Sequence, residues 1–190
     1  MAKPTCISRR IEQCIIDLQN DDFEGALLNL FPAIDNTAKK RRPGDGVGKR
    51  IKAFLTDEEV SISAIGTGNI FADISINGVK IPDALYKFGR TPIAHEGELD
   101  PRLEFNQTGE IKIGMEKWNL PIGYITGMCV ATIMAPENKD ERVVGNYSIN
   151  IFEKNFELNS IWGLRSEIEE HIGNVFGNQE VFSKSREVKN

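Results

Sequence analysis

The sequence predicts a mostly α-helical domain with small β-hairpin additions. Two stretches near the N-terminus, residues 7–18 and 23–34, repeat apolar residues at the three- and four-residue spacing of an amphipathic helix. Further along, residues 71–76 alternate in polarity and lead to Asn77-Gly78, a dipeptide typical of a tight β-hairpin turn. Long helical patterns and short strands together indicate a helical body that carries β additions.

Length and composition indicate one domain. The chain has 190 residues, of which 40% are hydrophobic and 27% charged, and this is ordinary for a globular protein. We expect the domain to cover residues 1–173 and a polar C-terminal tail to cover residues 174–190. The formal net charge of −5 argues against indiscriminate nucleic-acid binding, although a local basic patch could still bind phosphate.

The sequence also predicts where the protein works. The N-terminus lacks the apolar core of a secretory signal, and no apolar run is long enough to span a bilayer. Its three cysteines, Cys6, Cys14 and Cys129, have no metal-binding spacing and cannot all pair. We therefore expect a cytoplasmic protein with no membrane contact, no cofactor and no bound metal.

The first two predicted helices form an antiparallel helical hairpin. A polar break at residues 20–22 separates them and supplies capping residues for the second helix. Pro32 falls inside that helix, where it removes one hydrogen bond and favours a kink. Asp35 follows three residues later and is interpreted as a solvated or capping carboxylate.

A basic run follows the helical hairpin. Residues 39–52 contain seven basic residues and one acid, interrupted by a proline and three glycines. Gly48 and Lys49 resemble part of a phosphate loop, but Arg50 stands where that motif needs Ser or Thr, and no apolar strand precedes it. The run is either a phosphate-contacting edge that includes Lys49 and Arg50 or a solvated charge run between helices.

The middle of the chain mixes helices and hairpins. We predict a short helix from residue 51 and another whose cap lies at residues 56–59. Hairpins are expected near residues 70–81 and 103–113, on either side of a helix that begins at Pro82.

The last third of the chain is predicted to contain two helices and one strand. An apolar helix covers residues 119–135, with Asn119 as its N-cap and Pro121 near its start. A strand follows at residues 147–152, and a final amphipathic helix at residues 167–172. Trp118 and Trp162 are expected in the core.

Candidate catalytic groups lie on the helix that begins at Pro82. Arg90 and His95 stand five positions apart, which places them about 140° from each other around an ideal α-helix. They share a site only if the helix is distorted, begins between them or meets a second copy. Histidine has an unperturbed pKa near physiological pH, and a guanidinium binds phosphate oxygens in a planar fork.

The segment FGRTPIAHEGEL, preceded by a helical hairpin, resembles the HEPN superfamily of helical-bundle proteins. Arg90 and His95 match its signature of Arg, four to six residues and His, and Thr91 partly matches the polar residue that commonly follows the Arg. The apolar lead-in at residues 85–88 and the His-Glu-Gly continuation strengthen the likeness, which covers residues 5–135, whereas Pro92 and the hairpins depart from it.

The resemblance implies a HEPN-like helical bundle that forms a homodimer and cleaves RNA without a metal. Arg90 and His95 would be its catalytic residues at a dimer cleft, and the product would carry a 2′,3′-cyclic phosphate. Tyr86 and Thr91 would support them by hydrogen bonding the phosphate, and Glu96 would orient His95. Lys49 and Arg50 would hold the RNA strand.

Other functions stay open at this point. A non-catalytic HEPN-like module could bind a nucleotide or a partner protein, and a helical scaffold could carry no chemistry. His171 is interpreted as a surface residue, and His95 with Glu96 does not make a metal site, because adjacent residues point apart on a helix. The expected partners are therefore RNA or a nucleotide and a second copy of the chain.

Overall fold

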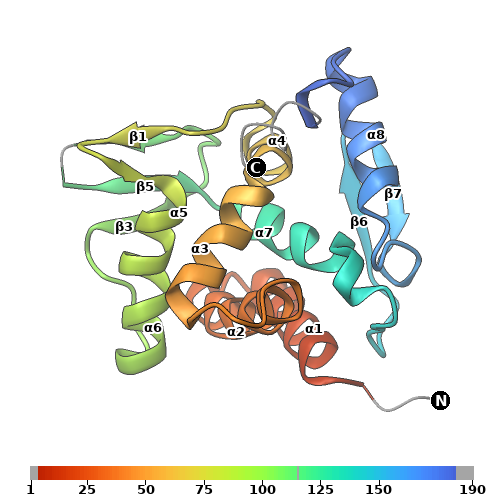
Figure 1. Ribbon diagram of the computed structural model, residues 1–190, viewed down its shortest axis with the longest axis horizontal. Coiled ribbons are helices and arrows are strands. Elements are labelled where there is room, and N and C mark those ends of the chain that lie inside the picture. Colours follow the sequence, from red (N-terminus) through yellow and green to blue (C-terminus); the bar gives the residue numbers. More distant parts are fainter. Residues whose placement is uncertain (1–3, 115, 183–190) are drawn as a thin grey trace.

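The computed structural model describes residues 4–114 and 116–182, and it confirms a mostly α-helical protein with some β structure. No helix in these two ranges is both long and apolar enough to cross a membrane. Figure 1 shows most of the helices packed in the middle of the molecule, with small β elements and the remaining helices at two opposite ends. The helices are α1 (Cys6–Gln19), α2 (Phe23–Arg41), α3 (Val47–Asp57), α4 (Glu59–Thr67), α5 (Ile81–Ala84), the π-helical η1 (Leu85–Arg90), α6 (Thr91–Glu96), α7 (Gly123–Met134), the short 3₁₀ turns η2 (Pro136–Asn138) and η3 (Leu158–Ser160), and α8 (Arg165–Phe176).

The predicted helical hairpin is α1 and α2. Thr5 caps α1 by accepting a hydrogen bond from the N–H of Ile7 at 3.1 Å. Asp22 caps α2 in the same way, by accepting from the N–H of Gly25 at 2.9 Å. Helix α2 is longer than its apolar stripe and includes the start of the basic run, whereas Lys49 and Arg50 lie on α3.

Helix α7 is the centre of the core. Ten of its residues are buried, so its apolar character all round reflects burial on every side. Two glycines let it approach α4 closely: a Cβ on Gly123 would overlap the backbone of Gly66, and a Cβ on Gly127 would lie 2.6 Å from the carbonyl oxygen of Ile62. Figure 1 shows α7 running between α1 and α2 on one side and α4 on the other.

The β structure consists of three small sheets. The predicted hairpin at Asn77-Gly78 is confirmed, because β1 (Ser75–Ile76) and β2 (Val79–Lys80) pair antiparallel. Both turn residues have positive φ, 52° for Asn77 and 76° for Gly78, as a tight hairpin turn requires. This hairpin leads directly into α5.

The predicted hairpin near residues 103–113 is wrong in its pairing. The strands β3 (Leu103–Asn106) and β4 (Lys112–Ile113) exist, but each pairs with β5 (Trp118–Pro121), which lies between them. Strand β3 runs parallel to β5, and β4 runs antiparallel to it. Placing β5 in the middle buries Trp118 and Leu120, which neither edge strand could cover alone.

The predicted start of the apolar helix is also wrong, because its first residues belong to the central strand β5. Asn119 is not an N-cap but a residue of β5, and Pro121 ends that strand. Helix α7 begins only at Gly123. The apolar run from Leu120 therefore divides into a buried strand and a buried helix, which hydrophobicity alone does not distinguish.

At the C-terminal end, a hairpin and a helix pack together. The predicted strand is β6 (Ser148–Ile151), and it pairs with a second strand that was not predicted, β7 (Lys154–Glu157). Helix α8 (Arg165–Phe176) includes the first three residues of the polar tail expected at residues 174–190. Residues 183–190 of that tail lie outside the described residues. His171 is not a simple surface residue: its Nε2 lies 2.8 Å from the carbonyl oxygen of Ile151, and its ring meets Phe156 edge to face.

A buried ionic network joins helices that are far apart in sequence. Arg41 on α2 contacts Glu58 at 2.8 Å and Asp57 at 3.0 Å, and its Nε donates to Glu137 at 2.7 Å. Arg165 on α8 also pairs with Glu58, whose side chain is 1% exposed. Burial raises the pKa of Glu58, and the two arginines oppose that shift.

Candidate functional site

The backbone around Arg90 departs from an α-helix. Helices α5, η1 and α6 follow one another without a break, and η1 is a π-helix of six residues. Pro92 has no N–H to donate to the carbonyl of Phe88, which accepts instead from the N–H of Asp100 at 3.1 Å. The N–H of Thr91 bonds the carbonyl of Tyr86, five residues earlier. Insertions of this kind inside helices are frequent at functional sites.

Gly89 brings this segment against α2. A Cβ at this position would lie 3.1 Å from both the ring of Phe31 and the side chain of Leu103, so a larger residue would push η1 outward. The close packing places the next residue, Arg90, beside α2. There it lines a small hollow of about 80 Å³ together with Leu28, Phe31, Pro32, Asp35, Ile93 and Ala94.

Arg90 keeps its guanidinium available in this hollow. The guanidinium carbon lies 6.0 Å from the centre of the Tyr86 ring, at the outer limit of a cation–π contact. Among the residues that the structure describes, no carboxylate forms an ion pair with Arg90. Arg90 is therefore a partly buried cation that is available to bind an anion.

Asp35 shares the hollow but already has a partner. Its Oδ1 accepts from Nε of Arg50 at 2.6 Å, and this hydrogen bond raises the pKa of Arg50. Asp35 was interpreted as a solvated or capping carboxylate; it instead ties α2 to α3. The sequence carried no signal for this pair, because fifteen residues separate its members.

Lys49, the other residue of α3 that was predicted to bind the RNA strand, also has a carboxylate partner. Lys49 donates to Asp45 at 2.7 Å, and Nη1 of Arg50 donates to the carbonyl of the same Asp45 at 3.1 Å. A Cβ on Gly48 would lie 2.9 Å from the hydroxyl oxygen of Tyr86, so the start of α3 packs directly on that ring. The fold thus brings Tyr86, Arg50 and Arg90 to one junction of α2, α3 and η1.

His95 and Glu96 are exposed in the last turn of α6, which Gly97 ends in a left-handed conformation with φ of 82°. Neither side chain makes a hydrogen bond or an ion pair within the described ranges. Since α6 is a regular α-helix after Arg90, the five-residue spacing turns His95 about 140° away from it. One copy of the chain does not bring the two predicted catalytic groups together.

Thr91 has a structural contact rather than a free hydroxyl. Its Oγ1 donates to the carbonyl of Tyr86 at 3.1 Å and so supports the π-helix. As for metals, no group of three or more His, Cys, Asp or Glu side chains in the described part of the chain could hold an ion.

The comparisons with known proteins place this chain beside mycobacterial relatives. A family model described as Rv1289 matches residues 6–186. The Rv1289 protein of Mycobacterium tuberculosis and the protein Mb1320 of Mycobacterium bovis, both described as uncharacterized, are each 25% identical over 167 residues, which covers 79% of this chain and 80% of theirs. No solved structure matches the chain.

Proposed function

The chain belongs to the Rv1289 family, and within that family we propose that it is a cytoplasmic, metal-independent endoribonuclease that works as a homodimer with a HEPN-like bundle. Arg90 of one copy and His95 of the other form its composite site. The observation that carries the proposal is that neither side chain has an ionic partner among the described residues. Arg90 is half-buried and contacts no carboxylate, and His95 is exposed.

The surface beside Arg90 supports a second copy as the partner. Leu28 on α2 is 46% exposed, and Pro32 and Ala94 also border the hollow without full burial. An apolar stripe of this kind, next to charged side chains, suits an isologous contact in which α2 and α6 of two copies face each other. Such a contact brings a His95 from outside toward each Arg90.

The proposed chemistry needs no group beyond these side chains, the RNA and solvent water. His95 accepts the proton of the ribose 2′-OH, whose oxygen attacks the adjacent phosphorus while the bond from phosphorus to the 5′-oxygen breaks. The departing 5′-oxygen takes a proton from solvent water and the protonated His95 returns its proton to solvent, so the products are a 2′,3′-cyclic phosphate and a 5′-hydroxyl. Arg90 stabilises the charge on the phosphorane oxygens.

The supporting residues keep distinct roles in this proposal. Tyr86 lies under Arg90 and positions its guanidinium, and Thr91 acts through the backbone of Tyr86 rather than on the phosphate. Lys49 and Arg50 contact the RNA strand by exchanging their present carboxylate partners for phosphates. Glu96 orients the neighbouring His95 once the dimer closes.

The deciding experiment is incubation of the purified protein with labelled single-stranded and structured RNA in EDTA. We expect wild type to cleave and to leave cyclic-phosphate ends, and we expect His95→Ala and Arg90→Ala each to reduce the rate by at least 100-fold, the lower range for removing a general base. His171→Asn is the matched control, since it alters the other histidine, and it should retain activity. Cleavage that survives both site substitutions would refute the mechanism.

One observation favours a second candidate, a non-catalytic module that binds a nucleotide. His95 makes no hydrogen bond among the described residues, so nothing in a single copy fixes its ring as a base. In this case Arg90→Ala would abolish nucleotide binding, His95→Ala would leave the affinity unchanged, and no RNA would be cleaved. Binding titrations of the two variants beside the cleavage assay separate the two functions.

A further inference from the structure

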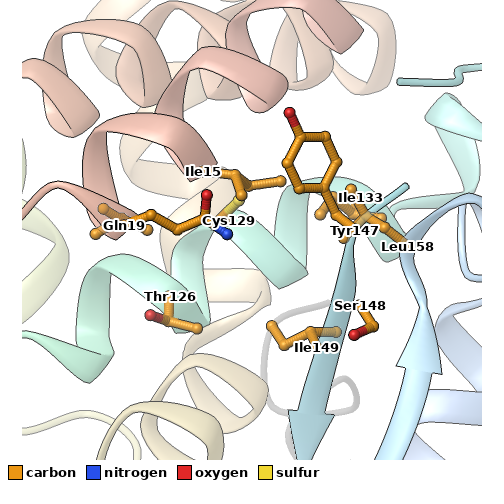
Figure 2. Close-up of a pocket in the computed structure, with 10 residues that line it drawn as sticks. Ile15, Gln19, Thr126, Cys129, Ile133, Tyr147, Ser148, Ile149 and Leu158 are labelled. Carbon is orange, nitrogen blue, oxygen red and sulfur yellow. The ribbon is translucent and has the colours of Figure 1, made fainter. Parts of the chain in front are cut away.

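A second pocket lies away from Arg90, between the C-terminal hairpin and two helices. Its volume is about 200 Å³, and its walls come from α1, from α7 and from β6 with the neighbouring Leu158 of η3. Figure 2 shows Ile15, Gln19 and Cys129, from α1 and α7, on one side of an open space and Tyr147 and Ile149 on the other. None of the residues that line this pocket belongs to the proposed ribonuclease site, so the two sites are independent.

The pocket wall is apolar and uncharged. Five aliphatic residues and the Tyr147 ring make most of it, and the Cys129 thiol adds a soft, weakly polar surface. The remaining polar groups are the Thr126 and Ser148 hydroxyls and the Gln19 amide, all neutral. The aliphatic residues are Ile15, Leu18, Ile133, Ile149 and Leu158.

The pocket is held open by contacts behind Tyr147. Glu12 on α1 accepts hydrogen bonds from the N–H of Gly145 at 2.7 Å and from the N–H of Val144 at 3.4 Å. Burial, together with the charge of Glu12 and a hydrogen bond to it, raises the pKa of Tyr147. A Cβ on Gly145 would overlap the Tyr147 ring, so glycine is needed there for the ring to stand where it does. These contacts fix the mouth of the pocket before any ligand arrives.

The floor of the pocket is fixed as well. Cys129 is 4% exposed, and its thiol is in hydrogen-bond contact with the fully buried thiol of Cys14 on α1. Thr126, Cys129 and Ile133 lie at spacings of three and four residues, and so on one face of α7. A rigid helix face therefore forms one side, opposite a hairpin strand.

We propose that this pocket binds a small, uncharged aromatic molecule that carries one hydrogen-bonding group, of the size of phenol or indole. An apolar cavity of about 150 Å³ holds benzene, so about 200 Å³ holds a ring system of roughly nine non-hydrogen atoms. A charged ligand would lose its hydration without a counter-charge in this wall. The Tyr147 ring offers an edge or a face to the ligand ring, and the Gln19 amide, which reaches into the open space in Figure 2, offers one hydrogen bond.

The test uses the intact chain with ¹³C-labelled isoleucine methyl groups and indole as the probe. Three isoleucines of the wall, Ile15, Ile133 and Ile149, report on the pocket, whereas Ile51 on α3 and Ile168 on α8 report on the core elsewhere. We expect saturable methyl shifts in the first three only. Absence of saturable shifts up to the solubility limit of indole would overturn the proposal.

Two variants that fill the pocket, compared with one control variant, test whether indole binds in this pocket. Thr126→Leu adds bulk from α7, and Leu18→Trp adds bulk from the half-buried Leu18 position on α1, a second filling variant on a different element in case the first fails to fold. Each should weaken indole binding at least tenfold, whereas Thr126→Ser should bind like wild type. Equal binding by the folded filled variants would show that indole binds elsewhere and would also overturn the proposal.

Discussion

Thr91 bonds the carbonyl of Tyr86 twice, through its N–H and through its hydroxyl at 3.1 Å. The bond from the backbone spans five residues and so defines the π-helix that ends at Arg90. Pro92 favours this arrangement because it cannot donate the hydrogen bond that a regular α-helix would place on Phe88. The direction of Arg90 thus depends on two neighbours that need not touch a ligand.

Replacing the hydroxyl of Thr91 should weaken this support. Thr91→Val keeps the branched shape but loses one hydrogen bond, and we expect it to lower the free energy of unfolding by about 1 kcal/mol. Thr91→Ser keeps the hydroxyl and should lose less. Urea unfolding of the three proteins measures both values, and equal losses would show that the hydroxyl contributes nothing.

Arg41 should be the most sensitive position of the ionic network. Arg41→Met leaves Glu137 without its principal partner and leaves the buried Glu58 with Arg165 alone, so we expect a loss of about 3–5 kcal/mol in the free energy of unfolding. Arg142→Met, at an exposed position, is the control and should change stability by less than about 0.5 kcal/mol. Denaturant unfolding would contradict the prediction if the two variants lost similar amounts.

A composite site predicts rescue when two inactive variants are mixed. In a dimer of Arg90→Ala and His95→Ala chains, one of the two sites keeps both side chains if they come from opposite copies. Random exchange makes half of the dimers mixed, so we expect about a quarter of wild-type cleavage activity after co-refolding. A mixture as inactive as each variant alone would place both groups in the same copy or show that no such site exists.

Acid should weaken the contact between Asp100 and Arg102. Hydrogen bonds from Arg102 lower the pKa of Asp100 to about 2, so the contribution of this pair to stability is present above the unfolded pKa of about 3.9 and is lost as the pH falls toward 2. Arg102→Gln should therefore be less stable than wild type at pH 6, and the gap should narrow between pH 4 and pH 3. Urea midpoints across this range test the sign, which a constant gap would contradict.

The cysteines should differ in reactivity. Cys6 is exposed, whereas Cys14 and Cys129 are buried, and a hydrogen bond with Cys129 together with burial raises the pKa of the Cys14 thiol well above its usual range. A thiol reagent should therefore label one cysteine rapidly in the native protein and three in denaturant. Cys6→Ser should remove the rapid phase, and rapid labelling that persists would show that the α1–α7 contact opens readily.

Local sequence patterns correctly predicted the elements that form through contacts between residues close together in the chain. The α1–α2 hairpin follows from apolar spacing and from the capping residues at 20–22, of which Asp22 is the cap, and the β1–β2 turn follows from Asn77-Gly78. The β6–β7 turn was missed because Phe152 and Glu153 both adopt positive φ, a conformation that neither residue type signals. The pairing of β3 with β5 was missed because it joins segments fifteen residues apart, and burial of Trp118 decides it.

Residue type and helical spacing are local properties of the chain, and they were enough to predict a mostly helical protein and to single out Arg90 and His95. The surroundings of these two residues follow instead from tertiary packing. It ended α2 beside α3 so that Asp35 meets Arg50, and it set Arg90 in a hollow while turning His95 outward. It also built the pocket between α1, α7 and β6. These contacts join distant segments through packing, whose energy depends on the whole fold rather than on any local pattern.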